Sequence, residues 1–289
     1  MNQILHDISW VVPLRNELVT PLFQVFTWLG YPTFIILALA LGYWLWGKAK
    51  FTRVAIIVLT STILNAFLKD LWENPRPDLV FRLDGKVGES FGMPSGHAQV
   101  SAVLWFWLAF QVRQTWAWIV ATIMVIGICF SRLYLGIHDL EDIAAGLLIA
   151  MLSLFAFGFL LTPRFKRLRD STVWLRLALV VVLAITVNLA WPPAEHSLGA
   201  LTLFGLLFTW ILGVSIETHL VAFEPRRTGF ALALIVIIGV IGLIALLAIT
   251  TSLLSRVEPL IAGTITSALL GIYITVLAPM LFKLCNLCA

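Results

Sequence analysis

The chain reads KDLWENPRP at residues 69–77, PSGH at residues 94–97 and SRLYLGIHDLED at residues 131–142, three polar clusters in a sequence that is otherwise mostly apolar. They contain cations, two histidines and several carboxylates. Charged and titratable side chains in apolar surroundings are energetically unfavourable and are usually kept for function. We therefore expect the fold and the chemistry to be organised around residues 69–142.

The composition is that of an integral membrane protein. Of the 289 residues, 61% are hydrophobic and only 12% are charged, and the mean hydropathy is +1.00, which is unlike a soluble domain. A helix needs about 20 apolar residues to cross a bilayer. The 12 Trp and 19 Phe residues suit membrane interfaces and lipid-facing surfaces, so they require neither a cofactor nor a nucleic-acid partner.

Long apolar runs predict an all-α, polytopic bundle of about nine transmembrane helices. The expected spans lie at residues 23–46, 54–68, 94–112, 116–130, 138–161, 173–190, 198–221, 230–254 and 260–282, behind an amphipathic interfacial segment at residues 1–20. Pro94 is expected to open the third helix, because a first-turn residue needs no N–H. Gly263, Ser267 and Gly271 lie four residues apart on the last helix. This spacing is typical of close helix packing, within the chain or between subunits of a homo-oligomer.

Basic residues between the spans indicate the orientation. Eleven fall on one side of the nine-helix arrangement: Lys48, Lys50, Arg53, Arg113, Arg164, Lys166, Arg167, Arg169, Arg226, Arg227 and Lys283. The other side has seven, three of them from the polar clusters. By the positive-inside rule the richer side is cytoplasmic. The N-terminus and all three clusters are therefore expected outside, and the C-terminus inside. The lack of an Asn-x-Ser/Thr sequence is compatible with a bacterial inner membrane, where the outer side is the periplasm.

The clusters contain the residue types of a phosphate site. Lys69, Arg76 and Arg132 supply positive charge, and Ser95 and Gly96 stand at an expected helix start. Cations and helix N-terminal amides together bind anions, and the forked donors of arginine match phosphate oxygens.

The two histidines suit covalent phosphoryl transfer. His138 and Asp142 are four residues apart and share a helix face, so the carboxylate can hold one ring nitrogen while the other attacks. His97 can protonate a leaving oxygen as general acid. No cluster has the spacing of a metal site.

Together the clusters resemble the three-part signature of the type 2 phosphatidic acid phosphatase family, which is related to the vanadium haloperoxidases. The parts occur complete and in order as Lys69 with Arg76-Pro77, Pro94-Ser95-Gly96-His97, and Ser131-Arg132 with His138 and Asp142. The resemblance implies a six-helix phosphatase core within residues 1–190, including the interfacial segment, and additional transmembrane helices at residues 191–289. The nine-span layout is similar to that of the glucose-6-phosphatase branch.

The resemblance also implies a role for each matched residue. His138 becomes a phosphohistidine, Asp142 supports it and His97 protonates the leaving group. The phosphoryl oxygens are held by Lys69, Arg76, Ser95, Gly96 and Arg132. No metal or other cofactor is implied. The loop at residues 78–93, which includes Asp84, Lys86 and Glu89, is expected from its position alone to select the substrate.

The expected function is hydrolysis of a lipid phosphate or diphosphate on the non-cytoplasmic face, with substrates of the phosphatidic acid, phosphatidylglycerol phosphate or polyprenyl diphosphate class. A phosphorylated lipid and the surrounding membrane lipids are the expected partners. Three enzymatic alternatives share the motifs: hydrolysis of a small soluble phosphomonoester, phosphoryl transfer to a second lipid, and haloperoxidase chemistry. A phosphate-binding transporter or scaffold is the non-enzymatic alternative, although binding alone needs neither His97 nor His138.

Polar residues outside the signature have simpler interpretations. Glu217 and His219 could form a functional intramembrane pair, but Glu217 is expected instead to pair with Arg226 or Arg227 near the cytoplasmic interface. His6 is interpreted as structural. Asp139 directly follows His138 but lies outside the matched positions, so it has no assigned role.

Overall fold

The computed structural model describes residues 5–85, 90–192 and 198–288. Every regular element within these ranges is a helix, and the only β pairing is one isolated bridge between Pro225 and Cys288. The all-α prediction is confirmed. Lys86 and Glu89, expected in the selectivity loop, lie outside the described residues.

The long helices follow the predicted spans in order. They are α2 (Thr20–Trp28), α3 (Pro32–Leu45), α4 (Lys48–Trp72), α5 (Gly96–Val112), α6 (Thr115–Tyr134), α7 (Leu140–Leu160), α9 (Val173–Ala190), α10 (Leu198–Ile216), α11 (Gly229–Leu253), α12 (Pro259–Ile272) and α13 (Ala278–Leu284). The short elements are η1 (Ser9–Leu14), η2 (Leu79–Phe81), η3 (Pro163–Phe165), α8 (Lys166–Arg169) and the π-helical segments η4 (Glu217–Val221) and η5 (Tyr273–Leu277).

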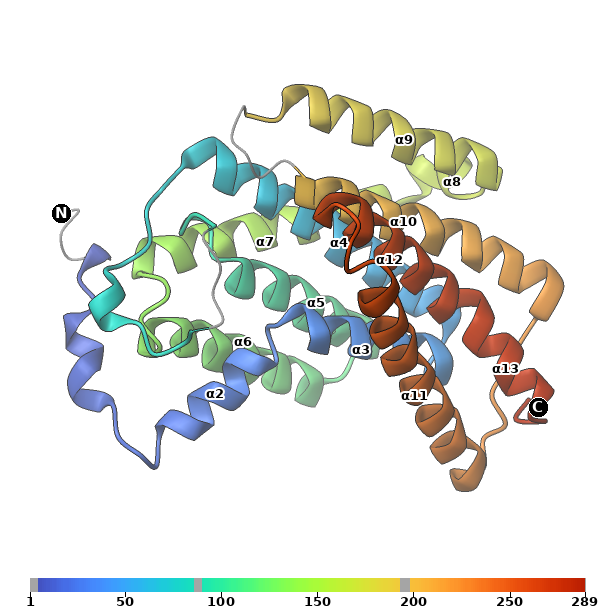
Figure 1. Cartoon of the computed structure of the whole chain (residues 1–289), viewed down its shortest axis with the longest axis horizontal. Coiled ribbons are helices and arrows are strands. Elements are labelled where there is room, and N and C mark those ends of the chain that lie inside the picture. The colour runs from blue at the N-terminus through green and yellow to red at the C-terminus, as the bar shows by residue number, and fades with distance from the viewer. Residues whose placement is uncertain (1–4, 86–89, 193–197, 289) are drawn as a thin grey trace. The chain divides into compact units, whose positions relative to one another are not determined.

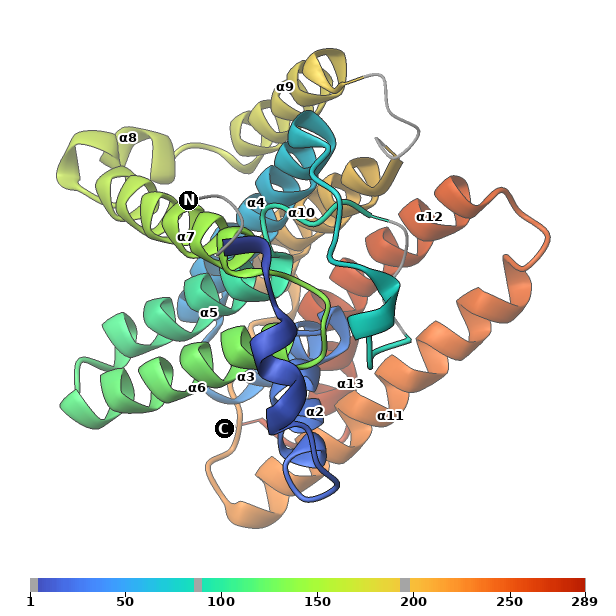
Figure 2. The same cartoon turned by 90° about the vertical axis from the view of Figure 1, so that its left-hand side faces the viewer.

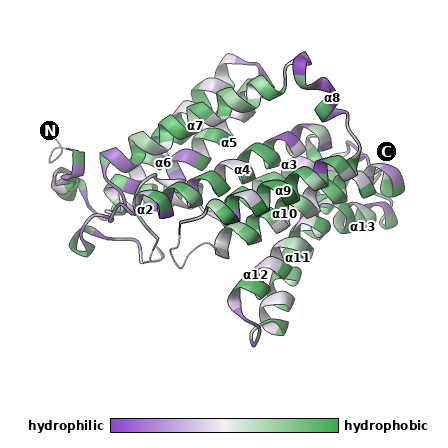
Figure 3. Ribbon diagram, turned by 90° about the horizontal axis from the view of Figure 1, so that it is seen from above, coloured by the Kyte–Doolittle hydropathy of each residue, from purple (hydrophilic) through white to green (hydrophobic). Residues whose placement is uncertain are grey.

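Among the described residues, seven helical segments are long and apolar enough to cross a membrane: Lys48–Trp72, Thr115–Tyr134, Leu140–Leu160, Val173–Ala190, Gly199–Val221, Gly229–Leu253 and Pro259–Leu284. The bent pair α2 and α3 makes an eighth. Helix α5 has 17 residues, the short end of the range for a span. These segments correspond one by one to the predicted spans. Apolar residues cover the long helices, whereas α8 is hydrophilic (Figure 3).

Two predicted helix boundaries are wrong. The segment expected as one helix at residues 23–46 breaks after Trp28 and bends by 55° before Pro32, because proline lacks the N–H that would continue the upstream helix. Helix α5 begins at Gly96 rather than Pro94. Ser95 is its N-cap, a position for which serine is among the preferred residues.

One compact unit, here the first unit, consists of Met1–Ile35, Thr60–Pro163 and Trp191–His196. In it α5 packs between α6 and α7, and α2 packs on α6 (Figures 1 and 2). The approach of α7 to α5 requires a glycine, because a Cβ at Gly146 would lie 2.7 Å from the Ser95 carbonyl oxygen. The first unit therefore contains all three polar clusters.

A buried polar network joins α4 to the start of α5 within the first unit. Asn65 Nδ2 donates to the Pro94 carbonyl at 3.1 Å and to Gln99 Oε1 at 2.9 Å. Gln99 Nε2 in turn donates to the Ser61 carbonyl at 2.8 Å. Satisfied buried amides fix the arrangement of the elements that they join, so this network sets where the PSGH cluster lies.

The second unit consists of Ile36–Leu59, Arg164–Ala190 and Ser197–Ala289, in which α10 packs on α9 and α12. A Cβ at Gly271 would lie 2.2 Å from Thr209 Oγ1 of α10, so this part of the small-residue face packs within the chain. Glu217 is fully buried and pairs with Lys48 at 2.9 Å. The expected pairing with Arg226 or Arg227 is wrong, because both arginines are exposed.

Candidate active site

The first cluster places two cations against a short loop. Lys69 lies in the last turn of α4, and its Nζ donates to the carbonyls of Phe91 and, at 2.8 Å, Gly92. Arg76 follows in the connection after α4. Its Nε donates to the Ser90 carbonyl at 2.6 Å, and its second terminal nitrogen donates to Ser90 Oγ at 2.9 Å. Both side chains therefore reach the segment that leads into the second cluster.

The second cluster is the start of α5. Ser95 is completely buried, and His97 lies in the first turn. The His97 ring packs edge-on against Tyr31, with ring centroids 4.9 Å apart. Gly30 provides the room for this ring, because a Cβ there would lie 2.4 Å from His97 Cδ2. Nε2 of His97 is buried without a hydrogen-bond partner among the described residues, so it is available to a polar group of a ligand.

The third cluster spans the connection from α6 to α7. Arg132, in the last turn of α6, is 1% exposed, donates to Thr27 Oγ1 and lies 3.4 Å from Asp84 Oδ2. His138 precedes α7, and its Nδ1 is 2.7 Å from Asp142 Oδ2. An ionised carboxylate only accepts hydrogen bonds. Nδ1 therefore carries the proton, and the lone pair of this histidine is on Nε2.

Direct contacts join the three clusters into one site. The Ser95 N–H donates to the Asp142 carbonyl at 2.9 Å, which joins the second cluster to the third. Arg76 connects the first to the third, because one terminal nitrogen lies 3.3 Å from both the Ile137 carbonyl and His138 Nε2. The chain passes close to Asp142 at Gly92, where only a glycine fits, since a Cβ would lie 2.9 Å from the Asp142 carboxylate.

The arrangement can hold and transfer an anionic group. Three cations act electrostatically on both histidines: Lys69, Arg76 and Arg132. One histidine is oriented by a carboxylate, and the other has a free ring nitrogen. This combination of an oriented nucleophile, a proton donor and a positive cradle suits phosphoryl transfer. Within the described part of the chain, no three His, Cys, Asp or Glu side chains are placed to share a metal ion.

Comparison with known proteins gives the family. A model described as the PAP2 superfamily matches residues 50–167, and one described as the PAP2 superfamily phosphatase, transmembrane extension, matches residues 201–289. Lipid A 4'-phosphatase of Bacteroides thetaiotaomicron is 31% identical over 154 residues, which cover 49% of this chain and 67% of the relative. The chain belongs to the PAP2 superfamily. The resemblance seen in the sequence is confirmed, and with it the expectation of a membrane phosphatase.

Other PAP2 relatives match a similar share of the chain. Sphingosine-1-phosphate phosphatase 2 of Mus musculus is 29% identical over 144 residues, 47% of this chain and 41% of the relative. Phosphatidylglycerophosphatase B of Bacillus subtilis is 27% identical over 173 residues, 55% of this chain and 81% of the relative. The chain thus spans less than half the length of the mouse relative.

The charge states of His138 and Arg76, two residues of the candidate site outside the spans, follow from their surroundings. Burial lowers the pKa of the His138 imidazole well below its ordinary value, and the charges of Lys69, Arg132 and Arg76 lower it further. Burial and the nearby Arg132 lower the pKa of Arg76 to about 10. At neutral pH the imidazole is therefore neutral and keeps a lone pair on one ring nitrogen, while the guanidinium keeps its charge.

Several residues around the site were not predicted. Thr27 bonds Arg132, Tyr31 packs on His97, and Ser90 holds Arg76. Asp139 caps α7, since its Oδ1 accepts from the Asp142 N–H at 2.9 Å. Only this last role has a local signal, an acidic residue placed just before a helix; the other contacts join distant parts of the sequence.

Proposed function

We propose that this PAP2 chain hydrolyses the phosphate of a lipid through a covalent intermediate on His138. The observation that carries the proposal is the 2.7 Å contact from His138 Nδ1 to Asp142, with Arg76 beside the opposite nitrogen. The contact with Asp142 holds His138 in one tautomer, and the Arg76 guanidinium lies where the phosphate would bind. Ser95 and Gly96, at the α5 N-terminus, would complete the cradle with Lys69 and Arg132.

The proposed reaction has two steps. In the first, Nε2 of His138 attacks phosphorus, the bond from phosphorus to the lipid oxygen breaks, and His97 gives its proton to that oxygen. In the second, His97 takes a proton from water, the water oxygen attacks the phosphohistidine, and the P–N bond breaks. Inorganic phosphate and the free imidazole result, so that each step returns the proton that the other used. Asp142 stabilises the imidazole while it carries the phosphoryl group.

The proposed substrate is an amphiphile with a phosphomonoester or diphosphate, such as phosphatidic acid, phosphatidylglycerol phosphate or a polyprenyl diphosphate. The relatives named for lipid A, sphingosine-1-phosphate and phosphatidylglycerophosphate support this class. The apolar surroundings support it further, because a substrate with a hydrocarbon tail can reach the site through the membrane.

We further propose a location and a division of the chain. The distribution of Lys and Arg supports a site on the non-cytoplasmic face of a bacterial inner membrane, with the N-terminus outside and the C-terminus inside. Residues 1–190 would form the phosphatase core and residues 191–289 additional spans, a division supported by the two regions that the family models match.

The test is phosphate release by purified protein from micellar phosphatidic acid, with chelator present. His138→Ala should abolish release, whereas His219→Ala, which removes an exposed histidine, should leave it unchanged. Rapid quenching should trap acid-labile phosphate on the wild-type protein. Release that persists in His138→Ala would remove the proposed nucleophile. A soluble sugar phosphate hydrolysed in preference to the lipid would replace the substrate class.

A further inference from the structure

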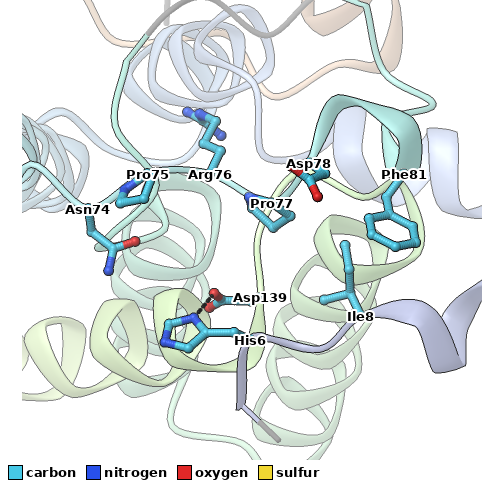
Figure 4. Close-up of a pocket in the computed structure, with 9 residues that line it drawn as sticks. All are labelled: His6, Ile8, Asn74, Pro75, Arg76, Pro77, Asp78, Phe81 and Asp139. Carbon is cyan, nitrogen blue, oxygen red and sulfur yellow. Dashed lines mark hydrogen bonds and ion pairs between the residues drawn. The ribbon is translucent and has the colours of Figure 1, made fainter. Parts of the chain in front are cut away.

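His6, near the N-terminus, bridges two carboxylates beside the nucleophile. Its Nδ1 lies 2.6 Å from Asp139 Oδ2, and its Nε2 lies 2.9 Å from Glu141 Oε2. The His6 and Glu141 side chains are 43% and 42% exposed, whereas that of Asp139 is 4% exposed. Figure 4 shows the contact of His6 with Asp139. Both residues line a cavity of about 500 Å³.

The double bridge requires a protonated imidazole. The contact of Nδ1 with Asp139 is a hydrogen bond, which a neutral imidazole can make with its single N–H. The contact of Nε2 with Glu141 is an ion pair, which exists only when the imidazole is a cation. The Asp139 hydrogen bond and the charges of Asp139, Glu141 and Asp142 raise the pKa of His6 above 6.5, although partial burial opposes them. The other charged residues of the cavity are Arg76 and Asp78.

Asp139 carries the effect of His6 to the catalytic pair. One of its oxygens bonds His6, and the other accepts from the Asp142 N–H at 2.9 Å. Asp142 in turn holds His138 Nδ1 at 2.7 Å. A continuous series of hydrogen bonds therefore runs from the N-terminal segment through the cap of α7 to the nucleophile.

The N-terminal segment has a second attachment in the same unit. Arg15 Nε donates to the Tyr134 carbonyl at 3.0 Å, and a terminal nitrogen of Arg15 donates to the Phe81 carbonyl at 2.7 Å. This attachment does not titrate near neutral pH. The segment is thus held by contacts that do not titrate near neutral pH and by one, at His6, that depends on a proton.

We propose that His6 is a positioning residue: as a cation it holds Asp139 and Glu141 together, fixes the cap of α7 and keeps Asp142 aligned with His138. Loss of its proton removes the ion pair with Glu141 and loosens the alignment. The enzyme is then most active where His6 is charged and loses activity as the pH rises through the His6 pKa. This regulation rests on the proposed phosphatase function.

The experiment compares kcat/KM for phosphatidic acid hydrolysis in wild type and His6→Gln from about pH 5 to pH 9. The ratio of the two values removes the titration of substrate and of shared groups. Glutamine has no titratable proton, so the ratio should pass through one step, highest at low pH. Its height should be about three-fold, within the range for an ion pair between partly exposed side chains. A ratio that does not change with pH overturns the proposal.

A matched control tests the route through Asp139. Asparagine caps helices as well as aspartate does, so Asp139→Asn keeps the bond to the Asp142 N–H while it removes the charge facing His6. This variant should lose the same step as His6→Gln, and the double variant should lose no more. If the losses of the two single variants add up in the double variant, His6 does not act through Asp139, because the effects of independent residues are additive and those of coupled residues are not.

A second measurement does not depend on catalysis. Hydrogen exchange at residues 5–14, corrected for the intrinsic effect of pH, should accelerate from pH 6 to pH 9 in wild type and be equally fast at both in His6→Gln. If the protein hydrolyses no lipid phosphate but hydrogen exchange shows the expected pH dependence, the proposed function is wrong and the proton-dependent attachment of His6 is supported. If hydrolysis occurs and exchange in the two proteins is alike at each pH, the attachment fails alone.

Discussion

Replacing Asp142 by asparagine tests how the nucleophile is oriented. Asp142 Oδ2 and His138 Nδ1 are 2.7 Å apart, and their side chains are at most 3% exposed, so the contact is shielded from water. A hydrogen bond to a charged group contributes about 1.5–3 kcal/mol, which corresponds to about 10- to 100-fold in rate. If the new amide turns its NH2 group to Nδ1, the imidazole proton moves to Nε2. A wrong tautomer costs a catalytic histidine about 10⁴-fold.

We therefore expect kcat for Asp142→Asn to fall at least about ten-fold. Steady-state phosphate release gives kcat, and rapid-quench measurement of acid-labile phosphate shows whether the first step is the one slowed. Asp170→Asn is the matched control, because the same change is made at an exposed carboxylate. A kcat for Asp142→Asn within about two-fold of wild type would refute the orienting role.

Three further outcomes follow from particular contacts. Because burial and nearby cations lower the pKa of His138, the neutral nucleophile persists below pH 6.5; the acid limb of kcat/KM should lie below that pH and fall as the imidazole takes up its proton. Gly92→Ala should reduce kcat about 100-fold by displacing the catalytic carboxylate, since its Cβ would lie 2.9 Å from Asp142 Oδ2. Lys48→Met should lower the free energy of unfolding by about 3 kcal/mol, because it leaves the buried Glu217 without its cation; denaturation in detergent measures this.

The controls for these changes are in the chain itself. Gly85→Ala adds a methyl group with nothing within 4 Å and should preserve kcat, so an equal loss would show that the loop tolerates no alanine. Lys50→Met removes an exposed cation and should leave the unfolding free energy unchanged. An acid limb centred above pH 6.5 would show that His138 is not held neutral by its surroundings.

Hydropathy was sufficient to predict the helical order, because each span must satisfy its backbone within the membrane and therefore appears as a long apolar run. Hydropathy alone did not predict two local features, a helix break and a buried ion pair. The break before Pro32 has a signal in the sequence, a glycine and a proline two residues apart. The run around them is apolar throughout, so hydropathy alone predicts one unbroken helix. The partner of Glu217 depends on burial at the π-helical end of α10, and hydropathy gives no indication of which cation can reach that place.

The candidate site likewise has residues that the sequence predicts and residues that only the structure reveals. The signature was sufficient to propose Lys69, His97 and the pair His138 and Asp142, because its spacing along the chain is fixed. The residues that hold them come from elsewhere: Thr27 bonds Arg132 across 105 positions, and His6 bonds Asp139 across 133. Such contacts arise only when the helices pack, and no local pattern predicts them.

In the proposed mechanism, the contacts of Arg76 connect substrate binding to activation of the nucleophile. One of its terminal nitrogens lies 3.3 Å from Nε2 of His138, and its other donors bond Ser90. The lone pair that would attack phosphorus in the proposed mechanism therefore faces a hydrogen-bond donor. An N–H directed at the imidazole lone pair cannot at the same time bond a phosphate oxygen, so a phosphate that recruits this donor also uncovers Nε2. A lysine at this position has a single ammonium group, so it could not keep the bonds to Ser90 while it exchanged the imidazole for a phosphate oxygen. This difference explains why a forked guanidinium suits the site.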